Sequence, residues 1–330
     1  MFKAIATLLS CFLILASHNA VADASSQKWK IGHVRPAGSA IDKDVHTFVD
    51  QINSATNGTI QIDIYPASKL GDYSTVQERV SFGEVEMFVG PFGTAIDKRV
   101  ALAFTPFIVS TWEEAKEVYF QGSALFNKMA EILEAQNIKL VGGWPVYFGG
   151  IALTQKPVQP GNPDVSKETI IRVPPIRSFE RTARALGYTP YPITWTYAKM
   201  GLKTGMVKGI LGGGAEGYIG LKGVIKYYLP INDHFEYWFV YMNLDLWNGL
   251  PEKIKSLVLN LCKDIERQRY SVAERDESDS IKRLTEIGVE IITLSEKQQS
   301  YIEKKVKKTV WPEMRNEIGE DFDTIVKQLK

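Results

Sequence analysis

Short runs of β-branched residues alternate with longer segments of helical periodicity along most of the chain. Residues 29–34, WKIGHV, form the first expected strand, and the apolar residues of the segment after it fall on one helical face. Residues 59–65, TIQIDIY, alternate between apolar and polar side chains, which predicts a half-buried strand. Because strands that alternate with helices are typical of α/β layers built on largely parallel sheets, the pattern predicts an α/β fold.

The same periodicities predict the remaining elements. Further strands are expected at residues 85–89, 138–141, 150–154, 209–214 and 235–243, and further helices at 74–82, 111–136 with a break at Gly122, 177–186 and 202–207. After Pro251, helical periodicity continues to Ile287, just before Gly288. One unbroken helix of that length would measure about 55 Å at 1.5 Å per residue, which is enough to cross from one domain to another.

The N-terminal residues have the composition of a secretory signal peptide. Lys3 precedes an apolar run at residues 4–16, and the small-residue triplet 20–22, AVA, follows. The run is shorter than the roughly 20 residues that span a bilayer, so we expect cleavage near Ala22 and a soluble, exported mature chain. Cys11 offers a lipoprotein alternative, which is disfavoured because four apolar residues still follow it. The roughly 300 mature residues exceed one comfortable core, which favours two domains.

Composition excludes several classes of function. The mature chain keeps one cysteine, Cys262, so it forms no internal disulfide, and His33, His46 and His234 lack zinc-ligand spacing. The formal charge is +1 and no basic run occurs, which disfavours nucleic-acid and anionic-membrane partners. We find no nucleophile elbow, P-loop or dinucleotide fingerprint, and the glycines at 212–214 lack the spacing of a phosphate loop. We therefore expect no cofactor and no metal.

Arginines and aromatic residues near predicted strand ends favour a small-molecule pocket. Such pockets are mostly apolar, with a few polar groups, and often lie between domains. Arg172 stands between aliphatic residues in a short strand, KETIIRVPP, where a buried charge needs a partner. From the residues alone, an internal ion pair and a ligand anchor are equally good interpretations. The other candidates near strand ends and loops are Arg35, Phe92, Trp144, Tyr147, Arg177, Trp195 and Tyr197, and ordinary core packing is the alternative for most of the aromatic ones.

Several motifs together resemble the extracytoplasmic solute receptors of tripartite ATP-independent periplasmic (TRAP) transporters, the DctP type. These are residues 31–33, IGH; 65–72, YPASKLGD; 105–107, TPF; 171–174, IRVP; and 186–190, LGYTP. They follow the family's order and intervals across nearly the whole mature chain. Each motif is modest, but YPASKLGD followed by IRVP is specific in combination.

The resemblance implies a two-domain periplasmic-binding-protein (Venus flytrap) fold with crossing hinge strands and the long helix spanning both domains. It implies domain I at 23–149 plus about 238–277, domain II at 150–237 plus about 278–330, and a ligand cleft between them. It also implies that Arg172 pairs with a carboxylate of the ligand, with Trp195 against the ligand. The end of the first strand places Val34 and Arg35 near the cleft, and Phe92 follows a later strand.

Two departures from the family pattern change the expected pocket. Ile151 occupies the position where many members have a second ligand-facing arginine. Residues 208–212, KGILG, lack the acidic and amide side chains that many members have there and end in glycine. We therefore expect one anionic head group on Arg172, with a hydrophobic or aromatic remainder beside Gly212. The side chains expected around that remainder are Trp195, Tyr147, Trp144 and Phe92. A sulfonate is the alternative head group, with Arg35 or Arg177 as a second positive contact.

The resemblance also implies a partner and a location. Such receptors are not enzymes; they work in the periplasm and deliver solute to a membrane permease with a small and a large subunit. A periplasmic sensor subunit for a signalling partner would share the pocket, and an exported α/β enzyme acting on a small acid is a weaker alternative. The balanced charge and the lack of a heptad seam favour a monomer.

Overall fold

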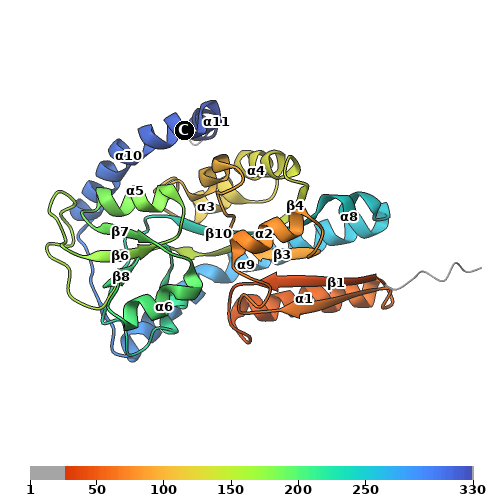
Figure 1. Cartoon of the computed structure of the whole chain (residues 1–330), viewed down its shortest axis with the longest axis horizontal. Coiled ribbons are helices and arrows are strands. Elements are labelled where there is room, and N and C mark those ends of the chain that lie inside the picture. The colour runs from red at the N-terminus through yellow and green to blue at the C-terminus, as the bar shows by residue number, and fades with distance from the viewer. Residues whose placement is uncertain (1–26, 329–330) are drawn as a thin grey trace, which may run out of the picture.

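The computed structural model describes residues 27–328. The predicted signal peptide and its cleavage site at Ala22 lie outside the described residues. Two β-sheets lie beside each other, with helices covering their faces (Figure 1). Within the described residues, no helix has the combination of length and apolar composition that a membrane crossing requires.

The first sheet has the order β2-β1-β3-β10-β4. Its strands are β1 (Gln27–His33), β2 (Ile60–Tyr65), β3 (Met87–Gly90), β4 (Ile138–Phe148) and β10 (Phe235–Asn243). β1 pairs parallel with β2 and β3, whereas β10 pairs antiparallel with β3 and β4. All nine residues of β10 are buried, which agrees with its nearly continuous run of large apolar side chains.

The second sheet has the order β11-β9-β5-β8-β6-β7. Its strands are β5 (Ile151–Leu153), β6 (Ile170–Val173), β7 (Thr189–Pro192), β8 (Gly209–Ile210), β9 (Tyr227–Leu229) and β11 (Glu290–Ile291). β5 is antiparallel to both its neighbours, and β6 is parallel to both of its own. In each sheet one strand runs against the others, β10 in the first and β5 in the second, so the sheets are mixed but largely parallel, as expected.

Twelve helical segments surround the sheets in the described part of the chain. They are α1 (Ala40–Ala55), α2 (Tyr73–Ser81), the 3-10 helix η1 (Lys98–Phe104), α3 (Trp112–Tyr119), α4 (Ala124–Glu134), α5 (Arg177–Ala185), α6 (Trp195–Lys203), α7 (Ala215–Ile219), α8 (Leu244–Gly249), α9 (Glu252–Glu286), α10 (Glu296–Ile318) and α11 (Glu320–Gln328). The expected break at Gly122 separates α3 from α4, and Gly122 has a positive φ of 94°. The helix expected at 202–207 was wrong: α6 lies earlier and ends before Gly205, whose φ is 75°.

The long helix α9 confirms the prediction from its periodicity. It has 35 residues, or about 52 Å at 1.5 Å per residue. It contacts α1 and β4 on the side of the first sheet, and α7 and β11 on the side of the second. One rigid element therefore extends along both halves of the molecule.

The C-terminal helices contact both halves as well. α10 packs against α5 beside the second sheet and against η1 beside the first, and α11 contacts α4. The residues after 278 therefore contact both halves of the molecule. The predicted division into two domains stays a prediction. The rings of Phe104 and Phe179 lie 6.0 Å apart where the two halves meet.

Candidate ligand-binding site

A small pocket lies where the two halves of the molecule face each other. Its free volume is about 50 Å³. The half that contains the first sheet contributes Val34, Arg35, Tyr73, Pro91, Phe104, Tyr147, Glu236 and Trp238, and the half that contains the second contributes Arg172, Pro174, Ile176, Phe179, Trp195 and Gly212. Both halves of the molecule therefore contribute to its wall.

Arg172 lies in β6 between Ile171 and Val173, which are fully buried. Its own side chain is only 1% exposed. Nε donates to the carbonyl of Ile193 at 2.7 Å, and Nη1 makes a longer contact of 3.5 Å to the carbonyl of Gly212. No carboxylate among residues 27–328 lies within 4.0 Å of the guanidinium. Burial lowers its pKa, and the internal ion pair allowed by the sequence is not formed in this part of the chain.

Gly212 and Pro174 fix the backbone beside this guanidinium. Gly212 has a φ of 82°, in the left-handed region, and a side chain there would approach the ring of Pro174 to 2.5 Å. Glycine is therefore required both by its conformation and by its close approach. The carbonyl that it directs at Arg172 partly satisfies the charge without supplying a counter-ion.

Trp195 is the first residue of α6 and lines the same pocket. The guanidinium carbon of Arg172 lies 5.5 Å from the centre of its indole ring, and that of Arg35 lies 5.3 Å from it. Both distances are within the range of cation–π attraction. The indole therefore has one arginine from each half of the molecule near it.

Arg35 follows β1 and is 5% exposed. Nη2 donates to the hydroxyl of Tyr147 at 2.9 Å, and Nε lies 3.9 Å from a carboxylate oxygen of Glu216. Its guanidinium also lies 5.1 Å from the ring centre of Trp238. Unlike Arg172, Arg35 has an acidic neighbour within the described chain.

Glu236 in β10 is an acidic pocket residue that the sequence reasoning missed. One carboxylate oxygen accepts a hydrogen bond from the Trp238 indole, and the other lies 3.3 Å from Nε2 of His234. Nδ1 of His234 lies 2.7 Å from a carboxylate oxygen of Asp233. Burial would lower the pKa of His234, but the two carboxylates outweigh it and raise the pKa to about 10. The imidazole is therefore protonated at neutral pH, and it shares its charge between both acids.

Tyr73 was missed too. It opens α2, lines the pocket and is 5% exposed. Within residues 27–328 its buried hydroxyl has no hydrogen-bond partner, and burial raises its pKa to about 12. An uncharged donor thus faces a pocket whose unpaired charge is a guanidinium. A tyrosine on the buried face of an amphipathic helix gives no sequence signal that separates this role from core packing.

The structure brings Arg172, Arg35, Tyr147, Trp195 and Gly212 together, with Val34 beside them. The other predicted site residues lie elsewhere. Phe92 stacks on Phe239 in the core with ring centres 4.3 Å apart. Trp144 is buried in the core of the first sheet and lies outside the pocket wall. The side chain of Arg177 is 72% exposed and lies 3.6 Å from Glu317.

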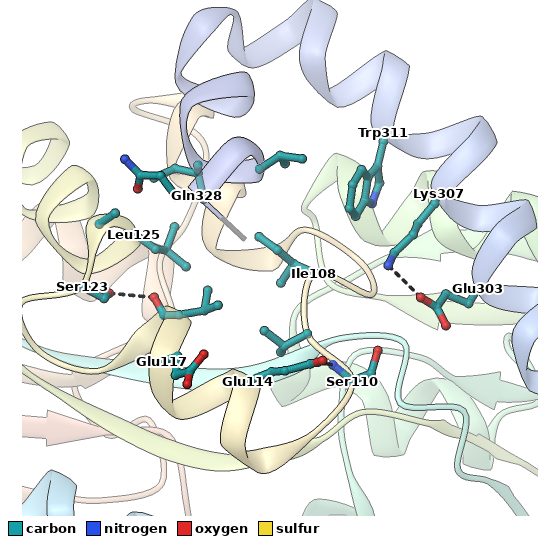
Figure 2. Close-up of a pocket in the computed structure, with 15 residues that line it drawn as sticks. Ile108, Ser110, Glu114, Glu117, Ser123, Leu125, Glu303, Lys307, Trp311 and Gln328 are labelled. Atoms are coloured by element: carbon teal, nitrogen blue, oxygen red, sulfur yellow. Dashed lines mark hydrogen bonds and ion pairs between the residues drawn. The ribbon is translucent and has the colours of Figure 1, made fainter. Parts of the chain in front are cut away.

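A larger groove lies away from this pocket, between α3, α4, α10 and α11 (Figure 2). Its free volume is about 760 Å³. Of its charged side chains, Glu114 accepts from the backbone amide of Ser110, Lys307 pairs with Glu303 at 2.7 Å, and Glu117 is exposed to solvent. Within residues 27–328, no group of three His, Cys, Asp or Glu side chains could hold a metal ion. The smaller pocket, with its buried guanidinium, is therefore the candidate ligand site.

Solved structures share this architecture. A TRAP periplasmic solute-binding protein from Desulfovibrio salexigens with bound orotic acid is 17% identical, with a TM-score of 0.84 over 92% of this chain and 97% of the other. An extracytoplasmic solute receptor from Bordetella pertussis that binds pyroglutamic acid is 20% identical, with a TM-score of 0.83 over 92% and 99%. The fold is thus the two-domain periplasmic-binding-protein fold that the sequence predicted.

The sequence itself matches a family along most of its length. The profile of DctP, described as bacterial extracellular solute-binding protein, family 7, matches residues 31–317. The C4-dicarboxylate-binding periplasmic protein DctP of Rhodobacter capsulatus is 21% identical over 90% of this chain and 89% of the relative. The chain belongs to the DctP family of solute-binding proteins, a class of transport receptors and not of enzymes, as its motifs predicted.

Proposed function

We propose that the chain is the periplasmic receptor of a TRAP transporter and that it captures a compact monocarboxylate on Arg172. One observation carries the proposal: a guanidinium 1% exposed lines the interdomain pocket with no carboxylate within 4.0 Å among residues 27–328. A buried cation of this kind is costly unless a partner satisfies it. A carboxylate from solution would supply that partner through paired hydrogen bonds.

The pocket supports one anionic group and a small remainder. Among the residues 27–328 that line it, Arg172 is the one cation with no carboxylate within 4.0 Å, since Glu216 lies 3.9 Å from Arg35. The free volume of about 50 Å³ is far below the several hundred Å³ of drug-sized ligand pockets. Phe92 and Trp144, which were expected to accommodate an aromatic remainder, lie outside the pocket wall. We therefore favour short aliphatic or small-ring carboxylates over large aromatic ones.

The hydroxyl of Tyr73 provides a second contact of the right chemistry. It lines the pocket and has no partner within residues 27–328, so it can donate to a carboxylate oxygen or to a hydroxyl or keto group of the solute. The rings of Trp195 and Tyr147 would pack against the carbon skeleton. A sulfonate presents similar acceptors and is the alternative head group.

Closure and delivery follow from the family. A solute can shift an equilibrium between open and closed forms only by binding one form more tightly. Arg172 and Trp195 lie on one side of the pocket, and Tyr73 and Tyr147 on the other, so a bound carboxylate would contact both halves only when they are closed. The proposed partner is a permease with a small and a large subunit, and the proposed receptor is a monomer. A signalling partner is the second possibility, and a pull-down from membranes separates the two.

The test is a thermal-shift screen followed by titration calorimetry. Sodium pyruvate, lactate, pyroglutamate, benzoate, succinate and a short sulfonate, isethionate, form the panel. A ligand that binds the folded state at about 100 times its Kd adds about 2.7 kcal/mol of stability. We expect the small monocarboxylates to raise the Tm most, with Arg177→Ala, which alters an exposed arginine outside the pocket, responding like the wild type. A shift only with succinate would overturn the monocarboxylate class, and no shift at all would count against the anion site.

A further inference from the structure

A contact across the interdomain pocket involves side chains from one half and glycines from the other. Arg35 follows β1 and Tyr147 lies in β4, both in the first sheet. They face residues 214–217, which end the loop after β8 and form the first turn of α7. We call this set of residues, Arg35, Tyr147, Gly214, Glu216 and Gly217, the closure contact.

The fit of the closure contact depends on missing side chains. A Cβ at Gly214 would lie 2.3 Å from Cδ2 of Tyr147, far inside van der Waals distance. A Cβ at Gly217 would lie 2.9 Å from Nη1 of Arg35. Gly214 has a φ of −131° and a ψ of −178°, extended backbone that any residue adopts. Glycine is therefore not required at 214 by the chain's own conformation, but it is required by the side chain that faces it.

The side chains of the closure contact have little room to move away. Tyr147 is 3% exposed, and its hydroxyl is held by Arg35 at 2.9 Å. The Arg35 guanidinium lies within 5.7 Å of the ring centres of Tyr147, Trp195 and Trp238. Glu216 lies 3.9 Å from Nε of Arg35, which gives the contact an attractive charge pair between the two halves.

We propose that the closure contact sets the open–closed equilibrium of the receptor, with Arg35 holding the closed form through Glu216 and with Gly214 and Gly217 permitting the approach. The proposal rests on the domain closure inferred above. It adds residues other than Arg172 to the groups that control this closure. It also gives Arg35 a positioning role, distinct from that of a second anchor for the solute. Gly214 is the decisive position because it has no side chain with which to bind a solute.

The variants separate a closing role from a binding role. Gly214→Ala adds one methyl group against Tyr147 and removes nothing, and Arg35→Gln removes the charge that Glu216 attracts. Gly220→Ala is the matched control: Gly220 is exposed, its φ is −64°, and an added Cβ has its nearest neighbour at an ordinary 3.7 Å. Circular dichroism and the Tm verify that each variant is folded.

The experiment measures the distance between the two halves by electron–electron double resonance. Spin labels are attached through Asp50→Cys in α1 and Lys203→Cys in α6, two exposed positions on opposite halves, while the native Cys262 is buried. Each variant is examined as purified and in a mixture of sodium pyruvate, lactate and pyroglutamate. We expect the wild type and Gly220→Ala to populate a short distance, and Gly214→Ala and Arg35→Gln to shift toward the long one. The corresponding loss of affinity should be about 5- to 150-fold, the ordinary range of coupling between sites.

Each outcome bears on the proposal. Gly214→Ala and Arg35→Gln with the wild-type distance distribution would overturn it, and so would a wild type that never populates the short distance. If only Arg35→Gln loses affinity while Gly214→Ala closes normally, Arg35 is a solute contact and the closing role is wrong. A short distance that is present but insensitive to all three carboxylates leaves the closure contact standing and contradicts the monocarboxylate site, so the two failures are distinguishable.

Discussion

The interdomain pocket and the groove of Figure 2 differ in size and in how their charges are satisfied. The groove has a free volume of about 760 Å³, and Lys307, the base that lines it, pairs with Glu303. The pocket has only about 50 Å³, yet it contains Arg172, a buried cation without a carboxylate partner in the described chain. A solute is therefore better indicated by an unsatisfied buried charge than by volume, because the charge has a free-energy cost that a ligand can remove.

The largest predicted effect on stability is at His234. Replacing it with alanine leaves the carboxylates of Asp233 and Glu236 buried without their shared cation. Breaking a buried ion pair from one side costs about 3–5 kcal/mol. We expect His234→Ala to lower the free energy of unfolding by that amount in urea titrations at pH 7. A loss below about 1 kcal/mol would show that the triad is neutral or hydrated.

The same triad predicts a dependence of stability on pH. The pKa of His234 is about 10 in the folded protein and near 6.5 when unfolded. Because the folded pKa is raised, its contribution is fully present below pH 6.5 and is lost as the pH rises toward 10. We expect the Tm of the wild type to fall across that window, as calorimetry can measure. His234→Gln should flatten the decline, and an unchanged slope in that variant would exclude His234 as its source.

Trp195 should have an intermediate effect on binding. Its ring lies near the guanidinium of Arg172, and cation–π contacts of desolvated groups contribute about 2 kcal/mol. We expect Trp195→Ala to weaken binding of the selected carboxylate by roughly that amount, or about 30-fold, in calorimetric titrations. Trp195→Phe should recover part of it. Equal losses of affinity in Trp195→Ala and Trp195→Phe would indicate that the size of the indole side chain, and not the presence of an aromatic ring, determines binding.

Substitution in the groove should have the smallest effect on stability and on binding. Lys307 is partly exposed, and its pair with Glu303 spans one helical turn of α10. Pairs of this kind contribute about 0–1 kcal/mol. We expect Lys307→Ala to change the free energy of unfolding by no more than that and to leave the carboxylate affinity unchanged. A loss of carboxylate affinity in Lys307→Ala would contradict the assignment of binding to the interdomain pocket and not to the groove.

The sequence predicted the main elements and the charge that defines the site. β10 has the predicted bounds 235–243, and α9 lies within one residue of its predicted ends, because apolar runs and long helical periodicity are strong local signals. Arg172 in β6 is a charge between apolar neighbours, and Glu236 in β10 has the same surroundings, Phe235 and Tyr237. Glu236 was not predicted as a pocket residue because a carboxylate at the second position of a strand is ordinarily exposed to solvent.

Aromatic residues were the part that sequence could not resolve. Tyr147 and Trp144 lie three positions apart in β4, where all but one of the eleven residues are buried, so no alternation of polar and apolar residues separates pocket from core. Register shifts between β4 and β10 change the face of the sheet on which a side chain lies, and such shifts depend on the partner strand. Gly214 likewise depends on Tyr147, a residue 67 positions away that only the fold brings near.

The central claim is that Arg172 is maintained as a buried charge for an anion from solution. Titration calorimetry of Arg172→Ala with the carboxylate selected by the screen tests this directly, with the Tm of the ligand-free variant measured in parallel. We predict that binding is lost or weakened by about 2–5 kcal/mol while the ligand-free protein stays folded. Wild-type affinity in Arg172→Ala would contradict the claim.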